Sequence, residues 1–412
     1  MSEYLIIGNS TAAIHAVEAI RTVDRKGKIV LVSDEPHHTY GRPLISYYLC
    51  GRTDRERMKY RPDDWYRQMQ VEPHLGIRAT ELHAEKKQVT LEDGSILPYG
   101  KLLVATGSRA FVPPMEGLER VTASYRFMTL SDAERIRQDF CPSDRVLIIG
   151  AGLIGLKCLE GIYGRVREIA VVDMADRILP SILDEEGASI VQTYLEKEKG
   201  ITFYLKDSAA SFPESNRVIL KSGRSLTFDR LVLAVGVRAN TELVKDAGGE
   251  CAKGILTDDR QRTSLPDVYA AGDCTESYDI ASGQRHILAL LPNASFQGHT
   301  AGLNMAGQEA HFDQAVAMNA MGLFDLHMVT AGVYDGTCYT ESRDGNYKKL
   351  YCRDNLLKGF LLIGDVARAG IYTSLLRNRI PLDRVDFARL RKEPALAAFS
   401  EEYRKEKLTK RV

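Results

Sequence analysis

A stretch of 22 residues occurs twice in this chain. The first copy, residues 89–110, reads VTLEDGSILPYGKLLVATGSRA, and the second, residues 218–239, reads VILKSGRSLTFDRLVLAVGVRA, with nine identical positions and no gap. Each copy contains a turn signal, Asp93-Gly94 or Ser222-Gly223, followed by a run of buried-strand type that ends in Ala-x-Gly. The duplication predicts two domains built on one plan.

A glycine-containing turn lies upstream of each copy, between a predicted strand and a predicted helix. The first turn lies in YLIIGNSTAAI at residues 4–14, and the second lies in VLIIGAGLIGL at residues 146–156. In this arrangement the helix N-terminus and its free N–H groups bind a phosphate. We therefore expect an α/β protein with two Rossmann-like dinucleotide-binding domains, each built on a parallel sheet.

The composition excludes several classes of protein. The 55 basic and 55 acidic residues balance, so the net charge indicates neither nucleic acid nor an anionic membrane as a partner. The seven cysteines form no CxxC pair, which argues against a disulfide framework, a zinc knuckle or an iron–sulfur cluster and favours the reducing cytoplasm. No signal peptide is expected, and no apolar run reaches the ~18 residues of a membrane span.

We expect three domains along the chain. The first comprises residues 1–112 and 241–311, and the second, residues 113–240, is inserted into it. Residues 312–412 form a separate α+β interface domain, which is expected to dimerise or to dock a partner protein. The strand-like segments of this last domain are residues 326–334, 347–351 and 359–363.

The second glycine turn carries a dinucleotide fingerprint. Gly150, Gly152 and Gly155 have GxGxxG spacing, in which the first glycine permits the turn, the second admits the pyrophosphate and the third packs helix against strand. Asp173 ends the next predicted strand, where a carboxylate binds the adenosine ribose and repels a 2′-phosphate. The spacing predicts an NAD(H) site that prefers NADH, although Arg177 nearby is a feature of NADPH sites.

The N-terminal turn departs from that fingerprint. Gly8 is followed by Ser10 and Ala13 at the second and third glycine positions. The Ser10 side chain would crowd a pyrophosphate, although its hydroxyl can donate to a phosphate oxygen. Asp34 and Glu35 end the next predicted strand, where a ribose-binding acid belongs. We expect a second dinucleotide site here, with a solvated turn as the alternative.

A third segment, TSLPDVYAAGD at residues 263–273, carries an acid at the end of an apolar strand. Small residues before Gly272 allow a ligand close to the backbone, and a half-buried Asp273 needs a hydroxyl or amide partner. With this segment, residues 1 to about 310 resemble the FAD-dependent pyridine nucleotide oxidoreductases. The resemblance implies that the first domain binds FAD, that Asp273 binds its ribityl chain, and that the second domain binds NAD(H).

The resemblance also assigns individual residues to the two cofactors. Those expected at FAD are Gly8, Ser10, Ala13, Asp34, Glu35, Arg42, Pro43, Thr106, Gly107, Arg109, Gly272, Asp273 and Pro292. Those expected at NAD(H) are Gly150, Gly152, Ile154, Gly155, Asp173, Arg177 and Gly236. No catalytic side chain is expected, because hydride passes between the nicotinamide C4 and the flavin N5. No metal site is expected either, because His37, His38 and His299 lack metal-like spacing.

Within that family, YGRPLIS at residues 40–46 resembles the rubredoxin and ferredoxin reductase branch and the flavin part of nitrite reductase. The resemblance places the Arg42-Pro43 pair near the isoalloxazine. This chain has Tyr47 where that branch often has a lysine, and Lys157 where relatives usually have a glutamate after the NAD(H) turn. The role of the lysine in steadying flavin N5 is therefore not carried over.

The cysteines narrow the activity further. A disulfide reductase needs two cysteines one helical turn apart at the flavin, and only Cys50 lies in that region. We therefore exclude glutathione- or lipoamide-type activity. An oxidase with a single redox cysteine would need Cys50 beside the isoalloxazine, and a packed thiol is the favoured interpretation.

Without a redox dithiol, electrons must pass between the flavin and an external Fe–S partner, such as a ferredoxin-like protein or a rubredoxin. The GNSTAA and GRPLISYYL segments and the terminal domain also resemble the flavin subunits of multi-subunit anaerobic oxidoreductases, such as tungsten aldehyde:NAD oxidoreductase and phenylglyoxylate dehydrogenase. We therefore favour an NAD-reducing flavin subunit that works with a metal-containing catalytic subunit. The alternatives are a free-standing NADH:rubredoxin or ferredoxin reductase and a non-enzymatic flavoprotein that senses NADH.

Overall fold

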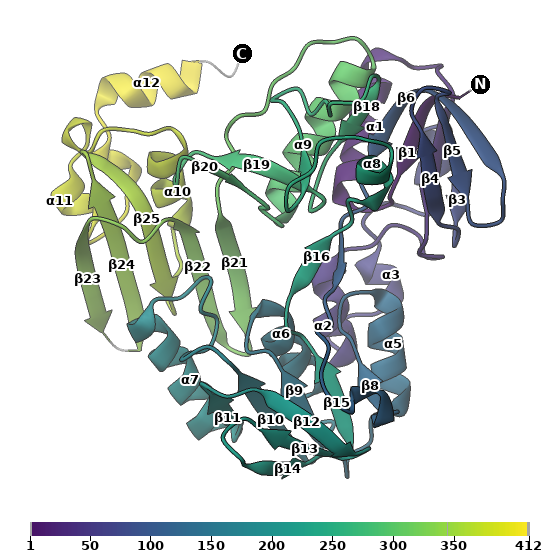
Figure 1. Cartoon of the computed structure of the whole chain (residues 1–412). Coiled ribbons are helices and arrows are strands. Elements are labelled where there is room, and N and C mark those ends of the chain that lie inside the picture. The colour runs from purple at the N-terminus through teal and green to yellow at the C-terminus, as the bar shows by residue number, and fades with distance from the viewer. Residues whose placement is uncertain (1, 344, 410–412) are drawn as a thin grey trace. The chain divides into compact units, whose positions relative to one another are not determined.

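The computed structural model describes residues 2–343 and 345–409, and Figure 1 labels many of its helices and strands. The chain forms two compact units. The first unit comprises Met1–Ala175, Ile201–Tyr278 and Arg285–Ala315, and the second comprises Asp176–Gly200, Asp279–Gln284 and Val316–Val412. The bounds of the three predicted domains stay a prediction. None of the described helices is both long and apolar enough to cross a membrane.

The first unit contains a seven-stranded sheet in the order β3-β2-β1-β6-β5-β4, with β18 paired to β6. The pairings of β3, β2, β1, β6 and β18 are parallel, and β4 and β5 extend the sheet with antiparallel pairings. The strands are β1 (Ser2–Ile7), β2 (Ile29–Ser33), β3 (Val71–Leu75), β4 (Ala79–His83), β5 (Gln88–Leu91), β6 (Ile96–Val104) and β18 (Val268–Ala270).

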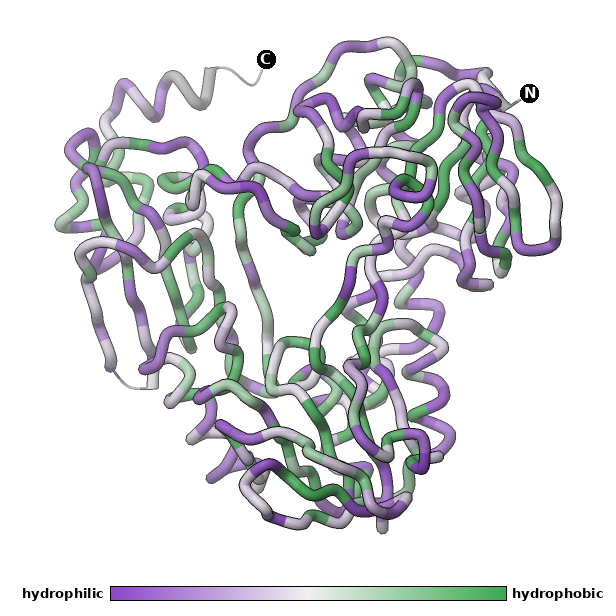
Figure 2. The backbone as a smooth tube through the Cα atoms, in the orientation of Figure 1, coloured by the Kyte–Doolittle hydropathy of each residue, from purple (hydrophilic) through white to green (hydrophobic). Residues whose placement is uncertain are grey.

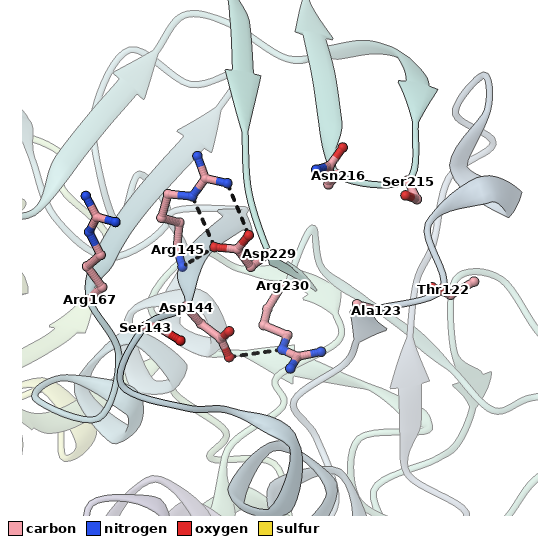
Figure 3. A pocket seen from close by; sticks show the side chains of 10 residues that line it. All are labelled: Thr122, Ala123, Ser143, Asp144, Arg145, Arg167, Ser215, Asn216, Asp229 and Arg230. Atoms are coloured by element: carbon pink, nitrogen blue, oxygen red, sulfur yellow. Dashed lines mark hydrogen bonds and ion pairs between the residues drawn. The ribbon is translucent and has the colours of Figure 1, made fainter.

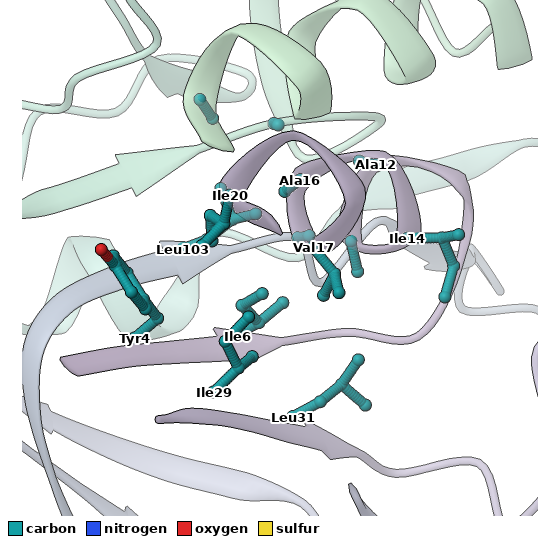
Figure 4. Close-up of a cluster of buried hydrophobic side chains, with 14 of the residues drawn as sticks. Tyr4, Ile6, Ala12, Ile14, Ala16, Val17, Ile20, Ile29, Leu31 and Leu103 are labelled. Carbon is teal, nitrogen blue, oxygen red and sulfur yellow. The ribbon is translucent and has the colours of Figure 1, made fainter. Parts of the chain in front are cut away.

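Helices α1 (Thr11–Val23) and α9 (Leu291–Met305) pack closely against each other beside this sheet. A Cβ atom on Gly298 would lie 2.0 Å from the Ala12 carbonyl oxygen, and one on Gly302 would lie 2.3 Å from the Ala16 carbonyl oxygen. Only glycine permits this approach. Figure 4 shows the core on the other side of α1, formed by Ile14, Val17, Ile20, Ile6, Ile29, Leu31 and Leu103.

A second parallel sheet, in the order β11-β10-β9-β15-β8, lies in the same unit. Its strands are β8 (Ser124–Tyr125), β9 (Arg145–Ile149), β10 (Glu168–Asp173), β11 (Thr202–Leu205) and β15 (Arg230–Leu233). The helices that follow β8 and β9 are α5 (Leu130–Asp139) and α6 (Leu153–Ile162). A small antiparallel sheet contains β12 (Ala209–Glu214), β13 (Arg217–Leu220) and β14 (Ser225–Thr227).

The two copies of the sequence repeat meet at their ends. β7 (Ser108–Ala110) and β16 (Val237–Ala239) pair antiparallel, with Arg109 opposite Arg238. These residues occupy equivalent positions in the two copies, so the repeat is visible in the structure as a two-stranded crossing between the halves of the unit.

Short elements complete the first unit. They are η1 (Arg42–Leu44), α2 (Ile45–Leu49), α3 (Arg55–Met58), α4 (Trp65–Gln68), η2 (Leu118–Arg120), α8 (Glu242–Asp246), and the sheet of β17 (Ile255–Leu256), β19 (Thr275–Asp279) and β20 (Gln284–His286).

The second unit is built on an antiparallel sheet in the order β21-β22-β25-β24-β23. The predicted segments correspond to three of its strands, and the outer strands β21 and β23 were not predicted. Its central strand β25 is mostly buried, whereas the edge strand β23 is largely exposed and hydrophilic, as the colours of Figure 2 show. The elements are β21 (Met318–Leu323), β22 (Leu326–Gly332), β23 (Thr337–Arg343), β24 (Asn346–Arg353), β25 (Leu356–Ile363), α7 (Glu185–Lys199), α10 (Ala369–Arg377), η3 (Leu382–Arg384), α11 (Phe387–Leu390), η4 (Leu396–Ala398) and α12 (Glu401–Thr409).

Asp184 connects α7 to this sheet. Its Oδ1 accepts the α7 cap hydrogen bond from the Gly187 N–H at 2.8 Å. Its Oδ2 accepts from Lys349 Nζ at 2.8 Å, from the Tyr351 hydroxyl at 3.0 Å and from the Tyr347 hydroxyl at 3.1 Å. Burial alone would raise the pKa of Asp184, but these donors and the Lys349 charge outweigh it and keep the pKa below its ordinary value.

We expect Asp184→Ala to lower the free energy of unfolding of the second unit by about 3 kcal/mol, because it leaves Lys349 without its carboxylate. The stabilisation by Asp184 is fully present above the unfolded-state pKa of about 4 and is lost as the pH falls through the lower pKa of the folded state. Urea titrations at pH 7 and pH 3 measure both effects. As a control, Asp386→Ala removes a cap bond to the Arg389 N–H and should cost only about 1 kcal/mol.

Candidate dinucleotide-binding sites

The N-terminal turn joins the carboxyl end of β1 to α1. Gly8 has a φ of +127°, and a Cβ atom there would lie 2.2 Å from the Ala105 carbonyl oxygen. Ser10 is the N-cap of α1, but its hydroxyl makes no cap hydrogen bond. Ala13 is fully buried. The turn therefore needs glycine only at its first position, and the Ser10 hydroxyl remains suited to donate to a phosphate.

The acids after β2 have different surroundings. Asp34 is exposed and lies 3.6 Å from Arg78. Glu35 accepts hydrogen bonds from Arg42 Nη2 at 2.5 Å and from the Tyr40 hydroxyl at 2.7 Å. The structure thus brings together two residues that the sequence assigned to opposite ends of FAD. Pro43 follows Arg42 in the first turn of η1.

Asp273 follows β18 at the carboxyl edge of the first sheet. Burial raises the pKa of its carboxyl, and the Arg42 charge partly offsets this effect. No hydrogen bond reaches this carboxylate from any other residue that the structure describes. A half-buried acceptor of this kind, next to a glycine, fits the hydroxyls of the FAD ribityl chain.

Gln297, which the sequence analysis did not single out, positions the backbone before Asp273. Its Oε1 accepts from the Gly272 N–H at 2.9 Å, and its Nε2 donates to the Thr275 hydroxyl at 3.0 Å and to the Ser277 hydroxyl at 2.7 Å. The side chain is buried in α9, which begins with Pro292 in its first turn. The sequence signal that could have identified Gln297 is its position as a polar residue among the small residues of α9.

The first repeat copy ends against the crossing segment. The Thr106 hydroxyl donates to the Asn240 carbonyl at 2.8 Å, and the Gly107 carbonyl accepts from the Asn240 N–H at 2.9 Å. Arg109 donates to the Asn240 side chain at 2.7 Å and to Glu242 at 2.6 Å. These three residues, expected at FAD, are therefore bonded to the chain that returns from the second sheet. Asn240 holds these three residues in place, whereas the sequence marked it only as the end of the second predicted domain.

The second glycine turn has the geometry that its spacing predicts. Gly150 has a φ of +116°, and its Cβ would lie 2.2 Å from the Ala234 carbonyl oxygen. A Cβ on Gly155 would lie 1.9 Å from the Gly150 carbonyl oxygen, whereas one on Gly152 would meet no atom within 4 Å. Ile154 lies half-buried in the first turn of α6. The first and third glycines are thus required by the fold, and the second leaves open space for a ligand.

Asp173 lies at the carboxyl end of β10, and its carboxylate bonds the turn itself. Its Oδ2 accepts from the Ala151 N–H at 2.6 Å, and its Oδ1 accepts from the Ala175 N–H at 2.8 Å. Gly236, with a φ of +119°, accepts through its carbonyl from the Phe111 N–H at 2.9 Å. Arg177 belongs to the second unit, where its Nη1 donates to Asp176 at 2.8 Å. Asp173 therefore shapes the glycine turn that is expected to bind NAD(H).

We expect Asp173→Ala to reduce the preference for NADH over NADPH by about tenfold, which corresponds to about 1.4 kcal/mol, because it removes the charge that repels a 2′-phosphate. The ratio of kcat/KM for the two nucleotides measures this effect. The KM for NADH should also rise, since the Ala151 N–H loses its acceptor. An unchanged ratio would assign the preference to another residue.

A separate hollow of about 570 Å³ lies at the other edge of the second sheet. Figure 3 shows two of its arginines paired with carboxylates, Arg145 with Asp229 and Arg230 with Asp144. Arg145 and Arg230 are the first residues of β9 and β15. Dinucleotides bind at the carboxyl ends of parallel strands, so this hollow at the amino ends is not the NAD(H) site.

The cysteines form no disulfide among the described residues. Cys50 follows α2, is half-buried, and its thiol donates to the Tyr47 carbonyl at 3.4 Å. This geometry is that of a packed thiol at a helix end.

Comparison with known proteins identifies the family. Residues 2–298 match the pyridine nucleotide-disulphide oxidoreductase family. The chain is 30% identical over 399 residues to the NADH-dependent phenylglyoxylate dehydrogenase subunit epsilon of Aromatoleum evansii, covering 92% of this chain and 93% of that protein. It is 28% identical over 308 residues to the rubredoxin-NAD(+) reductase of Pseudomonas putida, covering 74% and 80% of the two chains.

A solved structure extends the likeness to nearly the whole fold. The crystal structure of the covalent putidaredoxin reductase–putidaredoxin complex matches with a TM-score of 0.87 and 22% identity, covering 96% of this chain and 99% of that chain. The predicted fold class and the two predicted cofactors are confirmed. The chain belongs to the pyridine nucleotide-disulphide oxidoreductase family and is an FAD-dependent NAD(H) oxidoreductase.

Proposed function

We propose that this chain is the NAD-linked flavin subunit of a multi-subunit oxidoreductase and passes electrons between NAD(H) and an Fe–S partner. The observation that carries the proposal is the 30% identity to the phenylglyoxylate dehydrogenase epsilon subunit, which extends over 92% of this chain and 93% of that protein. A match over more than nine-tenths of both chains includes the C-terminal sheet as well as the cofactor-binding motifs.

The side chains of this protein bind and orient the two cofactors. Bound FAD supplies both hydride and single-electron chemistry. Asp273 would accept from the ribityl hydroxyls, and Ser10 with the α1 N-terminus would bind the FAD pyrophosphate. The open backbone at Gly152 would admit the NAD(H) pyrophosphate, and Asp173 would bind its adenosine ribose. In this arrangement, hydride transfer between NAD(H) and FAD needs no acid–base side chain.

The absence of a dithiol directs the electrons out of the chain. Cys50, whose thiol bonds the Tyr47 carbonyl, has no neighbouring cysteine with which to form a redox disulfide in its segment. An Fe–S protein or subunit is the partner that accepts or delivers single electrons. We propose further that a metal-containing catalytic subunit completes the enzyme and that the reaction takes place in the cytoplasm.

The alternative is a free-standing NADH:rubredoxin or ferredoxin reductase, which the 28% identity to the Pseudomonas putida rubredoxin-NAD(+) reductase favours. A non-enzymatic flavoprotein that senses NADH is a third possibility.

Affinity capture of the tagged chain from its source cells, followed by absorption spectra before and after anaerobic NADH, separates these functions. Fe–S absorption beside the flavin bands, bleached by NADH, is the expected result for a subunit. Flavin bands alone that recover when rubredoxin or ferredoxin is added indicate the free-standing reductase and overturn the subunit proposal. A reduced flavin that reoxidises slowly, with no effect of either carrier, indicates the sensor.

A further inference from the structure

A polar cluster joins α2 to α6 within the first unit. The Lys157 ammonium lies 4.6 Å from the centre of the Tyr47 ring, and the Arg52 guanidinium lies 5.9 Å from the same ring. Both cations also pair with Glu160: Arg52 Nη1 lies 3.6 Å from its carboxylate, and Lys157 donates to it directly. We call these four residues the Tyr47 cluster.

The charges of the cluster explain why Lys157 stays over the ring. The Glu160 side chain is only 2% exposed, so its carboxylate requires a cation within the protein. Arg52 is 52% exposed and more distant, whereas Lys157 is 20% exposed. Glu160 therefore fixes the Lys157 ammonium in the place where it also contacts the face of Tyr47.

The two helices also touch through their backbones near the cluster. A Cβ atom on Gly161 of α6 would lie 3.0 Å from the Leu49 side chain and 3.1 Å from the Ser46 carbonyl oxygen of α2. The two helices are therefore in close contact at Gly161. The Tyr47 cluster and the Gly161 contact therefore fix the distance between α2 and α6.

Each helix continues from a segment expected at a different cofactor. α2 follows η1, which carries Arg42, and Arg42 acts electrostatically on Asp273. α6 follows the turn that contains Gly150 and Gly152. The contact between the helices thus connects the segment expected at FAD to the turn expected at NAD(H).

We propose that Tyr47 and Lys157 act as one positioning pair that sets the distance between the nicotinamide and the flavin. Both are positions at which the chain departs from the family that it resembles, and the structure places them in contact. Hydride transfer requires reacting atoms about 3–3.5 Å apart, and a displacement of about 1 Å costs about a hundredfold in rate. The inference rests on the proposed NAD(H)–FAD reaction and assigns a role within it.

Stopped-flow reduction of the FAD-loaded protein by NADH under anaerobic conditions tests the pair. Tyr47→Phe keeps the ring and should reduce the flavin within about twofold of the natural rate. Tyr47→Leu and Lys157→Met should each lower the limiting rate by about tenfold, with FAD content and the Kd for NADH unchanged. The double variant should be no slower than the slower single variant, because the two side chains act together.

Two controls keep the result specific. Arg135→Met removes a different cation–π contact, 4.8 Å from the Tyr125 ring, and should leave the limiting rate unchanged. Tyr47→Leu leaves the pairing of Glu160 with Lys157 intact, so it tests the proposal even where Lys157→Met fails to fold.

A natural limiting rate in Tyr47→Leu would overturn the proposal, as would losses that multiply in the double variant. A normal limiting rate with weakened NADH binding would overturn it too, because Tyr47 would then act in affinity. Failure of the proposed function is a different result, in which the natural protein itself is not reduced by NADH.

Discussion

Replacing Asp273 by alanine is expected to weaken FAD binding by about ten- to a hundredfold. The carboxylate is half-buried, and no other described residue donates a hydrogen bond to it. A hydroxyl that donates to a charged acceptor gains about 1.5–3 kcal/mol, which the alanine variant loses. The measurement is the dissociation constant of FAD, from quenching of flavin fluorescence when the apoprotein is titrated with FAD.

Asp267 provides a matched control near the other end of β18. Its carboxylate pairs with Lys87 and Lys101, and this pairing lowers its pKa. Asp267→Ala should therefore reduce stability and leave the Kd for FAD unchanged. Asp273→Asn keeps an acceptor without the charge and should weaken FAD binding less than alanine does. Full flavin retention in Asp273→Ala would remove Asp273 from the FAD site.

The motifs that lie within a few residues of each other were predictable from the sequence. The close contacts around Gly150 and Gly155 follow from their spacing, because the strand, the turn and the helix are consecutive in the chain. The parallel strands of the two large sheets follow from the duplicated unit for the same reason. The spacing of neighbouring residues specifies the geometry of each glycine turn, because most contacts within a turn join residues that are close in sequence.

Contacts between distant segments were not predictable. The bond from Gly272 to Gln297 spans 25 positions, and the contact between Thr106 and Asn240 spans 134. Their partners become neighbours only after the sheets have formed. The pairing of Glu35 with Arg42 is close in sequence, but it depends on the fold of η1. No spacing rule distinguishes an acid that binds ribose from one that pairs with arginine.

The outer strands of the C-terminal sheet were missed for another reason. β23 reads TCYTESR and is largely exposed, so it lacks the apolar alternation that reveals a strand. It forms because β24 offers it a complete antiparallel ladder. Pairing with a neighbour can thus produce a strand that its own side chains do not predict.

Gly152→Ala is expected to raise the KM for NADH by about ten- to a hundredfold while the protein folds normally. The φ of Gly152 is −81°, and a Cβ atom there meets no protein atom within 4 Å. The methyl group would instead occupy the space that the NAD(H) pyrophosphate approaches, and overpacking of this kind costs about 1–3 kcal/mol. Steady-state kinetics with NADH, together with flavin content and a thermal unfolding curve, measure the effect.

Two other glycines separate this effect from a general loss of structure. A Cβ atom on Gly370 of α10 would likewise meet no atom within 4 Å, so Gly370→Ala should leave the KM for NADH unchanged. In Gly150→Ala the Cβ would lie 2.2 Å from the Ala234 carbonyl oxygen at a φ of +116°, so this variant should lose stability as well as NADH binding. An unchanged KM in Gly152→Ala would mean that the pyrophosphate does not approach this turn. No described protein atom packs into the space beside Gly152. A higher KM for NADH in Gly152→Ala would therefore come from contact between the added methyl group and the nucleotide.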